Sequence, residues 1–364
     1  MLHGEIMQNW LVFSILVLVF LLVLLAVLLR WRAPLIHQPP APRTVVYFGG
    51  SITAGAGAST AQNAWAAIIA QWLEHKFHQY AWTHTNSGLA GKSSWYGLIR
   101  LQNDLIAKNP DLVFLDFAVN DAGTSRGDLQ NGFTTAAEAV IRRIRTKLPA
   151  AKLIALILAR PDTTGKDARD MWIALARHYD IQFELLDQEL TREIGSDQPT
   201  GEQLAAYFLS AIDVHPNDNG HRLIAAMIER DLLDLQPAWP KPIDRYGYYF
   251  PHSAIYEAEP IIRLAADHDA QSGEWLAVDG ALESSQPGAS ISWSANLCSF
   301  GVQTNVGAGA GRLEWSLDGG PFTPLDLSTG TDSLKVIWNF PRAEHTVTIR
   351  VVSGKVQLHR FYGI

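Results

Sequence analysis

The feature that most constrains the fold is an alternation of short apolar runs with helical patterns between Thr44 and Leu235. The apolar runs predict strands at Val45–Phe48, Trp82–Thr85, Leu112–Phe117, Leu153–Leu158 and Ile181–Leu186. Helical spacing occurs between them at Ala64–Phe77, Ser94–Lys108, Leu129–Lys147, Asp167–Tyr179 and Gly220–Leu235. This alternation predicts an α/β fold in which helices cover both faces of a parallel sheet.

The composition changes after residue 236. Residues 237–256 are rich in proline and aromatic residues and are interpreted as a connector. Short strand patterns separated by turn signals then occupy 257–364, at Trp275–Val278, Ser290–Trp293, Cys298–Gln303, Arg312–Leu317, Ser333–Trp338, His345–Val352 and Val356–Phe361. Many short strands with regular turns predict an all-β sandwich.

Residues 10–30 form an almost unbroken apolar run. At about 1.5 Å per helical residue, such a run crosses a hydrocarbon core of about 30 Å. It is long for a cleaved signal peptide, and no Lys or Arg precedes it. We therefore expect one transmembrane helix after a short tail (1–9), then a proline-rich linker (31–43) and a catalytic domain (44–236).

The charge distribution near this run bears on its orientation. Arg30, Arg32 and Arg43 all follow the run, which by the positive-inside tendency favours a cytoplasmic catalytic domain.

The formal net charge of the chain is -7, which argues against general nucleic-acid binding because such binding needs a basic face. Cys298 is the single cysteine, so the chain has no internal disulfide.

Four short polar blocks occur in order through the α/β part. They are Gly50-Ser51, Asn86–Gly91, Phe117–Asp121 and Asp213–Asn217. Each block is expected at a strand end or in a loop on the side where α/β sheets bind their ligands. Their shared location predicts that they form one site.

These residue types match the requirements of acyl transfer. A serine hydroxyl such as that of Ser51 needs a base, and His215 has the side chain suited to that role. The tetrahedral oxyanion needs preorganised donors. The backbone N–H groups of Ser51 and Gly91 and the side-chain amide of Asn120 are the candidates.

With these four blocks, the chain resembles the SGNH (GDSL-type) hydrolase superfamily from about Thr44 to Leu235. The resemblance implies a three-layer, flavodoxin-like fold and a Ser–His esterase mechanism without metal or cofactor. It makes Ser51 the nucleophile, Gly91 and Asn120 oxyanion-hole donors, and His215 the base.

The chain departs from the family pattern at three positions. Gly50 stands where the family often has Asp, and Ala118 stands where it usually has Gly, so that a methyl group could narrow the pocket. Ile212 occupies the position three residues before the histidine, where the family has Asp. Asp213 lies two residues before His215 and would face the same way in an extended segment, so it could complete a triad. Otherwise a backbone carbonyl orients His215 in a Ser–His dyad.

Each block also has a simpler interpretation. Asn120-Asp121 could be a turn pair, Asp213 or Asn217 a helix cap, and His215 a buried hydrogen-bonding histidine. Asn86–Ser93 resembles a phosphate-binding loop, but Asn86 replaces its first glycine. A nucleotide-binding hypothesis also leaves Ser51 and His215 without a role.

The β part resembles, more loosely, the jelly-roll modules attached to some carbohydrate esterases. Trp275, Trp293, Trp315 or Trp338 could stack on sugars if exposed, although most of them are expected in the core. We therefore expect a membrane-anchored serine esterase that removes, or transfers, short acyl groups on a polysaccharide. The alternatives are a polysaccharide O-acyltransferase, a non-catalytic carbohydrate-binding membrane protein, and a lipid esterase or thioesterase. A polymer substrate places the domain outside the cytoplasmic membrane, against the arginine bias.

Overall fold

The structure is a computed structural model of the chain. It describes residues 15–25, 40–123, 133–159, 166–235, 242–249, 260–307, 309–325, 327, 334–337 and 340–363. The chain divides into two compact units, Met1–Ala41 and Pro42–Ile364.

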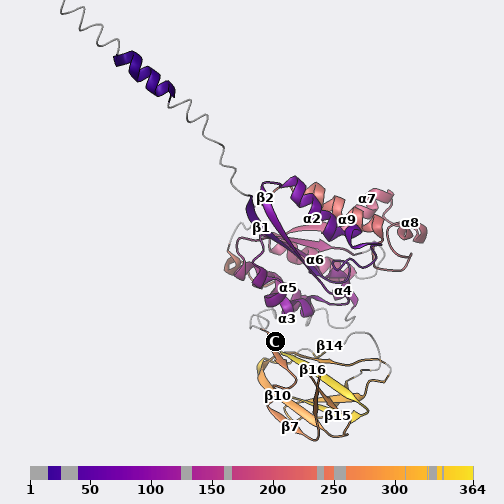
Figure 1. Cartoon of the computed structure of the whole chain (residues 1–364). Helices are drawn as coiled ribbons and strands as arrows, with labels where there is room; N and C mark the ends of the chain where they lie inside the picture. The colour runs from indigo at the N-terminus through magenta and orange to yellow at the C-terminus, as the bar shows by residue number, and fades with distance from the viewer. Residues whose placement is uncertain are drawn as a thin grey trace, which may run out of the picture. The chain divides into compact units, whose positions relative to one another are not determined.

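In the first unit, residues 15–25 form a helix, drawn in indigo in Figure 1, whose apolar side chains are exposed. The rest of the predicted membrane span, 10–30, lies outside the described residues. Among the helices that are described, none combines the length and the apolar content needed to cross a membrane. The transmembrane helix is not confirmed and remains a prediction.

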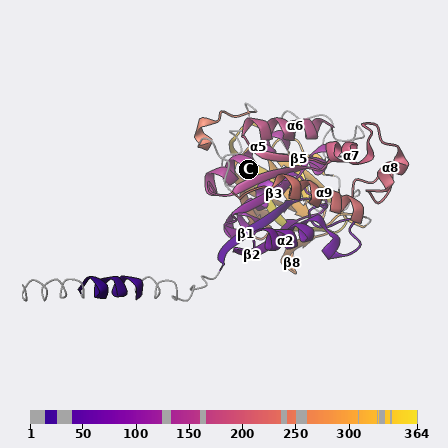
Figure 2. The ribbon, with the colours of Figure 1, turned by 90° about the horizontal axis from the view of Figure 1, so that it is seen from above.

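The second unit begins with an α/β sheet, as the sequence predicts. Within the described residues the sheet has the strand order β2-β1-β3-β4-β5, and β1, β3, β4 and β5 pair in parallel. This is the order of flavodoxin-like folds, and Figure 2 shows β2, β1, β3 and β5 following one another across the sheet. The strand bounds are β1 Ala41–Gly49, β2 Tyr80–Gly88, β3 Leu112–Asp116, β4 Lys152–Ile157 and β5 Gln182–Leu185.

Helices cover both faces of this sheet (Figure 1). Because side chains alternate along a strand, Val46 and Phe48 of β1 pack into one buried cluster and Val45 and Tyr47 into another. The first cluster contains side chains of α3 (Ser94–Asp104), α5 (Phe133–Lys147) and α6 (Lys166–His178). The second contains side chains of α2 (Trp65–Lys76), α7 (Leu186–Ile194) and α9 (Asp218–Asp231).

Three short helices were not expected from the sequence: α4 (Ala118–Gly123), α7 and α8 (Gly201–Ala205). The expected strand Ile181–Leu186 ends at Leu185, and α7 begins at the next residue, Leu186. The helix expected at Ser94–Lys108 ends at Asp104 and is followed by the 3-10 turn Ile106–Lys108. Other 3-10 turns span Ala61–Asn63 and Ile243–Arg245.

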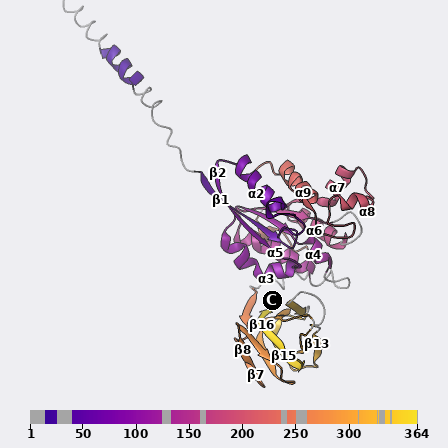
Figure 3. The ribbon, with the colours of Figure 1, turned by 45° about the vertical axis from the view of Figure 1, so that its right-hand side comes forward.

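The C-terminal part of the chain forms two antiparallel sheets (Figure 3). In spatial order, the first holds β13 (Thr323–Leu325), β12 (Arg312–Leu317), β15 (Ala343–Ser353), β10 (Ser290–Leu297) and β7 (Ala270–Ser272). The second holds β14 (Leu334–Ile337), β11 (Phe300–Thr304), β16 (Val356–Gly363), β9 (Ala281–Ser284) and β8 (Leu276–Val278), with β6 (Ile261–Leu264) also paired to β16.

One buried cluster contains inward-facing residues of both sheets. Trp293 of β10 stacks on Phe361 of β16 with ring centroids 5.0 Å apart, which joins the two sheets through the core. Trp293 is fully buried and Trp275 is buried, so neither offers an open face to a sugar. Trp315 is half-buried against Phe300, and Trp338 lies outside the described residues.

Candidate active site

Strand β1 places Ser51 at the sheet edge where the carboxyl ends of the parallel strands meet. The chain turns directly after Gly49: Gly50 N donates to the Asp116 carbonyl at the end of β3 over 3.0 Å, and Ala54 N donates to the Gly50 carbonyl over 3.1 Å. Ser51 is 7% exposed. The turn thus holds one serine hydroxyl at the neighbouring ends of β1 and β3.

The packing of this turn leaves no room for a side chain at Gly50 while Asn120 keeps its position. A Cβ atom at position 50 would lie 2.2 Å from Oδ1 of Asn120, far inside van der Waals contact. An aspartate here, which the family often has, would displace that amide from its present position. The absent side chain therefore allows Asn120 to lie directly against the serine turn.

Ser51, His215 and Asp213 form one hydrogen-bonded chain. Ser51 Oγ lies 3.0 Å from His215 Nε2, and His215 Nδ1 lies 2.7 Å from Asp213 Oδ1. A carboxylate only accepts, so Nδ1 carries the proton and Nε2 is left to accept from the serine hydroxyl. Ile212, which occupies the position of the family's aspartate, is 90% exposed.

Asp213 is held in place by a second bond to the same residue. Its Oδ1 also accepts from the backbone N–H of His215 over 2.8 Å. The bonds from the His215 backbone N–H and side chain lower the pKa of the Asp213 carboxyl below its ordinary value. Asp213 is therefore a carboxylate facing the imidazole throughout the neutral range.

The loop that carries His215 is anchored at both ends. Asn217 caps α9, because its Oδ1 accepts from Asn219 N over 2.9 Å and from Gly220 N over 3.3 Å. Leu209 N donates to the His215 carbonyl over 3.0 Å, and Asn217 N donates to the Tyr207 carbonyl over the same distance. The cap interpretation thus holds for Asn217, while Asp213 faces the imidazole.

The other two expected oxyanion donors lie on segments tied to the serine turn. Asn120 is in α4 against Gly50. Gly91 lies in the exposed turn after β2 with φ of +71°, a conformation that favours glycine. Leu89 N, two residues earlier, donates to the Gly49 carbonyl over 3.0 Å. The segments carrying Ser51, Gly91 and Asn120 therefore meet around Gly49-Gly50.

Asn86 is a site residue whose role the sequence did not reveal. Its side-chain nitrogen donates to the Thr53 carbonyl over 2.7 Å, which ties the end of β2 to the serine turn. Its Oδ1 accepts from Gly88 N over 2.9 Å. The sequence signal that could have revealed this role is an asparagine at a strand end before glycines, because its short side chain can form hydrogen bonds to the nearby backbone.

Two buried carboxyl groups lie beneath the site. Asp116 accepts from Thr53 Oγ1 over 2.8 Å, and burial raises the pKa of its carboxyl to about 6. Asp121 accepts from Ser94 N over 2.8 Å and from Trp172 Nε1 over 2.9 Å, and burial raises its pKa to about 7. Asp121 thus joins α4 to α3 and α6 and is more than a turn residue.

Two sequence-based interpretations change with these contacts. Ala118 is 2% exposed and belongs to the buried core, so its methyl group fills core space and does not narrow the site. Leu112–Asp116 is also an apolar strand with a terminal acid, as a nucleotide-binding site would need for magnesium, but Asp116 is 3% exposed and bonded to Thr53. Among the described residues no group of three or more His, Cys, Asp or Glu side chains is arranged to hold a metal ion.

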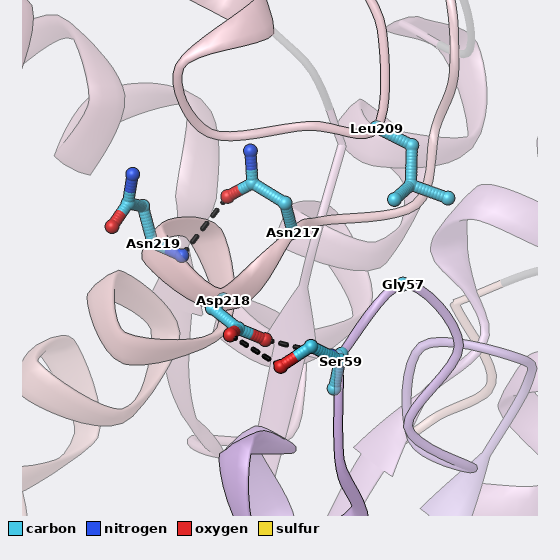
Figure 4. Close-up of a pocket in the computed structure, with 7 residues that line it drawn as sticks. Gly57, Ser59, Leu209, Asn217, Asp218 and Asn219 are labelled. Atoms are coloured by element: carbon cyan, nitrogen blue, oxygen red, sulfur yellow. Dashed lines mark hydrogen bonds between the residues drawn. The ribbon is translucent and has the colours of Figure 1, made fainter.

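A pocket of about 490 Å³ adjoins the histidine loop (Figure 4). Its walls come from the loop after the serine turn and the start of α9, with Leu209 as the large apolar side chain; they comprise Gly57, Ala58, Ser59, Leu209, Asn217, Asp218 and Asn219. Asp218 bridges the walls, because its carboxylate accepts from Ser59 N over 2.8 Å and from Ser59 Oγ over 2.6 Å. A Cβ atom at Gly57 would lie 3.3 Å from Cβ of His215, so the pocket begins beside the histidine.

A serine on a strand-end turn, bonded to a histidine that is bonded to a carboxylate, defines the class of serine hydrolases. Residues 47–223 match the model of the GDSL-like Lipase/Acylhydrolase family. The match covers just under half of the chain, so this stretch is similar to that family.

Individual relatives resemble the chain over different spans. Esterase TesA of Pseudomonas aeruginosa is 28% identical over 133 residues, which are 36% of this chain and 62% of that relative. A crystal structure of a two-domain esterase active on acetylated mannans is 22% identical, with a TM-score of 0.70, and the match covers 89% of this chain and 91% of that one. The same esterase co-crystallized with mannopentaose gives a TM-score of 0.71. At this identity the likeness establishes a shared fold.

Proposed function

We propose that the chain is a carbohydrate esterase that removes acetyl groups from a polysaccharide, with Ser51, His215 and Asp213 as its catalytic triad. The observation that carries the proposal is the bonded chain from Ser51 Oγ through His215 to Asp213, at 3.0 and 2.7 Å. Asp213, two residues before the histidine, takes the place that the family gives to an aspartate three residues before it.

The geometry supports a two-step mechanism. Ser51 Oγ attacks the ester carbonyl carbon while His215 Nε2 takes the hydroxyl proton, and Asp213 stabilises the resulting imidazolium. The Ser51 and Gly91 N–H groups and the Asn120 amide stabilise the oxyanion. His215 then gives its proton to the departing sugar oxygen, which leaves an acetyl group on Ser51. Water, deprotonated by His215, attacks that acetyl group and releases acetate.

The choice of a sugar substrate does not come from the pocket of Figure 4. That pocket lies beside the histidine loop, and neither Ser51 nor His215 is among the residues that line it. The likeness in fold to an esterase active on acetylated mannans agrees with a sugar substrate.

The test is acetate release from acetylated mannan by the full chain. We expect activity in the wild type and its loss in Ser51→Ala and His215→Ala. The matched controls are Ser272→Ala in β7 and His75→Ala on the exposed side of α2, which should retain activity. Equal activity of Ser51→Ala and wild type would show that the mechanism is wrong.

The same experiment separates the alternatives. Acetyl transfer to an added sugar in preference to water would indicate an O-acyltransferase, because both reactions share the acetyl-enzyme. Faster cleavage of long-chain esters than of acetyl esters would indicate a lipid esterase or thioesterase. Polysaccharide binding without any ester cleavage would indicate a carbohydrate-binding protein.

The proposal also includes a membrane anchor. The apolar run at 10–30 motivates a single span, and a polymer substrate motivates an extracytoplasmic catalytic domain. Protease treatment of intact spheroplasts should digest the domain. Full protection until lysis would place it inside the cell.

A further inference from the structure

Arg100 is a buried arginine whose side chain reaches the site from α3. It is 7% exposed, and it makes three hydrogen bonds. Nη2 donates to the Gly49 carbonyl over 2.9 Å, and Nη1 donates to the Ser87 carbonyl over 2.7 Å and to Asp104 Oδ2 over 2.9 Å. Two of its three partners are therefore backbone carbonyls at the ends of β1 and β2.

These carbonyls belong to the segments that carry the expected oxyanion donors. Gly49 is two residues before Ser51, and Ser87 is four residues before Gly91. The Gly49 carbonyl also accepts from Leu89 N over 3.0 Å. Arg100 and Leu89 thus bind the same oxygen, and the guanidinium fixes the spacing between the serine turn and the Gly91 turn.

The guanidinium is itself held rigidly. Its carbon lies 4.3 Å from the centroid of the Phe48 ring, and Asp104, one helical turn along α3, holds Nη1. Its Nε is buried without a hydrogen-bond partner among the described residues. A buried cation with an unmet donor is costly for stability, so stability alone does not account for an arginine here.

We propose that Arg100 is a positioning residue that sets the distance between the Ser51 and Gly91 N–H groups of the oxyanion hole, which rests on the proposed function. Both N–H groups act on charge that develops in the transition state. A change in their spacing should therefore lower kcat and leave KM nearly unchanged.

The first experiment compares Arg100→Met, Arg100→Lys and the control Arg145→Met. Arg145 is also buried and donates to a backbone carbonyl, that of Tyr179, over 3.2 Å; Tyr179 lies between α6 and β5, at the other end of the strands. We expect Arg100→Met to lower kcat by about 10- to 100-fold, with KM within threefold. Arg100→Lys, which can keep one carbonyl bond, should retain intermediate activity. Arg145→Met should lose stability but keep kcat within twofold. Equal kcat values for the two methionine variants, or a loss confined to KM, would overturn the proposal.

The second experiment does not depend on ester cleavage. Amide hydrogen exchange should show at least tenfold faster exchange at Leu89 in Arg100→Met, with no change at amides of β5. Unchanged exchange at Leu89 would overturn the positioning role even in an active enzyme. If the wild type cleaves no ester, the proposed function fails while the exchange result still decides whether Arg100 fixes this spacing.

Discussion

Two substitutions of Asp213 separate the two contributions of its Oδ1 oxygen, which are the orientation of the His215 imidazole and the negative charge beside it. Asp213 Oδ1 accepts both the Nδ1–H and the backbone N–H of His215, at 2.7 and 2.8 Å. An asparagine can present its amide oxygen to the same two donors. Asp213→Asn should therefore keep the imidazole tautomer and orientation and remove only the negative charge, whereas Asp213→Ala removes both.

The expected loss of kcat in Asp213→Asn depends on how far solvent reaches the Asp213–His215 pair. Two unit charges about 4 Å apart interact by on the order of 4 kcal/mol at an effective dielectric constant of about 20 and by about 1 kcal/mol in water. The Asp213 and His215 side chains are 35% and 31% exposed, so solvent screens the interaction. We therefore take about 2 kcal/mol for the charge interaction that stabilises the imidazolium in the transition state, which corresponds to roughly a 30-fold lower kcat for Asp213→Asn. Asp213→Ala should lose on the order of 10³-fold or more, because removal of the triad aspartate costs roughly 10⁴-fold in a serine protease. An Asp→Asn change costs about as much where the amide reverses the imidazole tautomer, so a loss of that size in Asp213→Asn would show that the amide nitrogen faces Nδ1.

The assay is steady-state hydrolysis of a chromogenic acetyl ester by the full chain, with circular dichroism to verify folding. Ile212→Ala is the matched control, because Ile212 is 90% exposed beside Asp213 and should leave kcat within twofold. If Asp213→Asn and Asp213→Ala lose the same activity, the argument from the shared oxygen is wrong. If neither loses more than twofold, the site works as a Ser–His dyad.

Three further predictions concern the surroundings of the triad. Asn120→Ala should lower kcat by about 10²- to 10³-fold with little change in KM, since its amide is expected to act on the oxyanion; a loss seen in KM alone would argue against this role. Gly50→Ala should also lower kcat, because the new Cβ would lie 2.2 Å from Asn120 Oδ1 and displace the amide. The double variant Gly50→Ala/Asn120→Ala should lose less activity than the product of the two single losses. Losses that multiply would mean that the two residues act independently. Asp121 has its pKa raised to about 7 in the folded chain, so the folded state keeps a proton that the unfolded state releases from about pH 4 upward. The free energy of unfolding should therefore fall as pH rises from about 4 to about 7, by up to about 1.4 kcal/mol per pH unit for this group. Urea titrations should show a smaller pH dependence in Asp121→Asn. An unchanged pH dependence would contradict the raised pKa of Asp121.

The sequence predicted the α/β layers well because the apolar runs of the central strands are long and continuous. Leu112–Asp116 and Lys152–Ile157 are buried along their whole length, so both faces of each strand carry the signal. Four strands of three or four residues were missed: Ile261–Leu264, Ala270–Ser272, Ala281–Ser284 and Thr323–Leu325. So few residues give little alternating pattern to recognise, although the equally short Leu276–Val278 was predicted.

The reactive side chains lie in short motifs, and their positions at strand ends are visible in the sequence. What fixes them in space depends on contacts distant along the chain. The residue that packs against Gly50 is Asn120, 70 residues later, and Arg100 looks like an ordinary residue of an amphipathic helix. The role of Asp213 was ambiguous because it depends on the backbone conformation between residues 213 and 215. That conformation brings Oδ1 of Asp213 to both the backbone nitrogen and Nδ1 of His215.

The central claim, an acyl-enzyme at Ser51, is tested most directly with a serine-directed phosphonate probe and mass spectrometry of the full chain. The account predicts one modified peptide that contains Ser51. Labelling should be slow in His215→Ala, because the hydroxyl then lacks its base, and absent in Ser51→Ala. A wild-type chain that is folded but unlabelled, or that is labelled at another serine, would contradict the account.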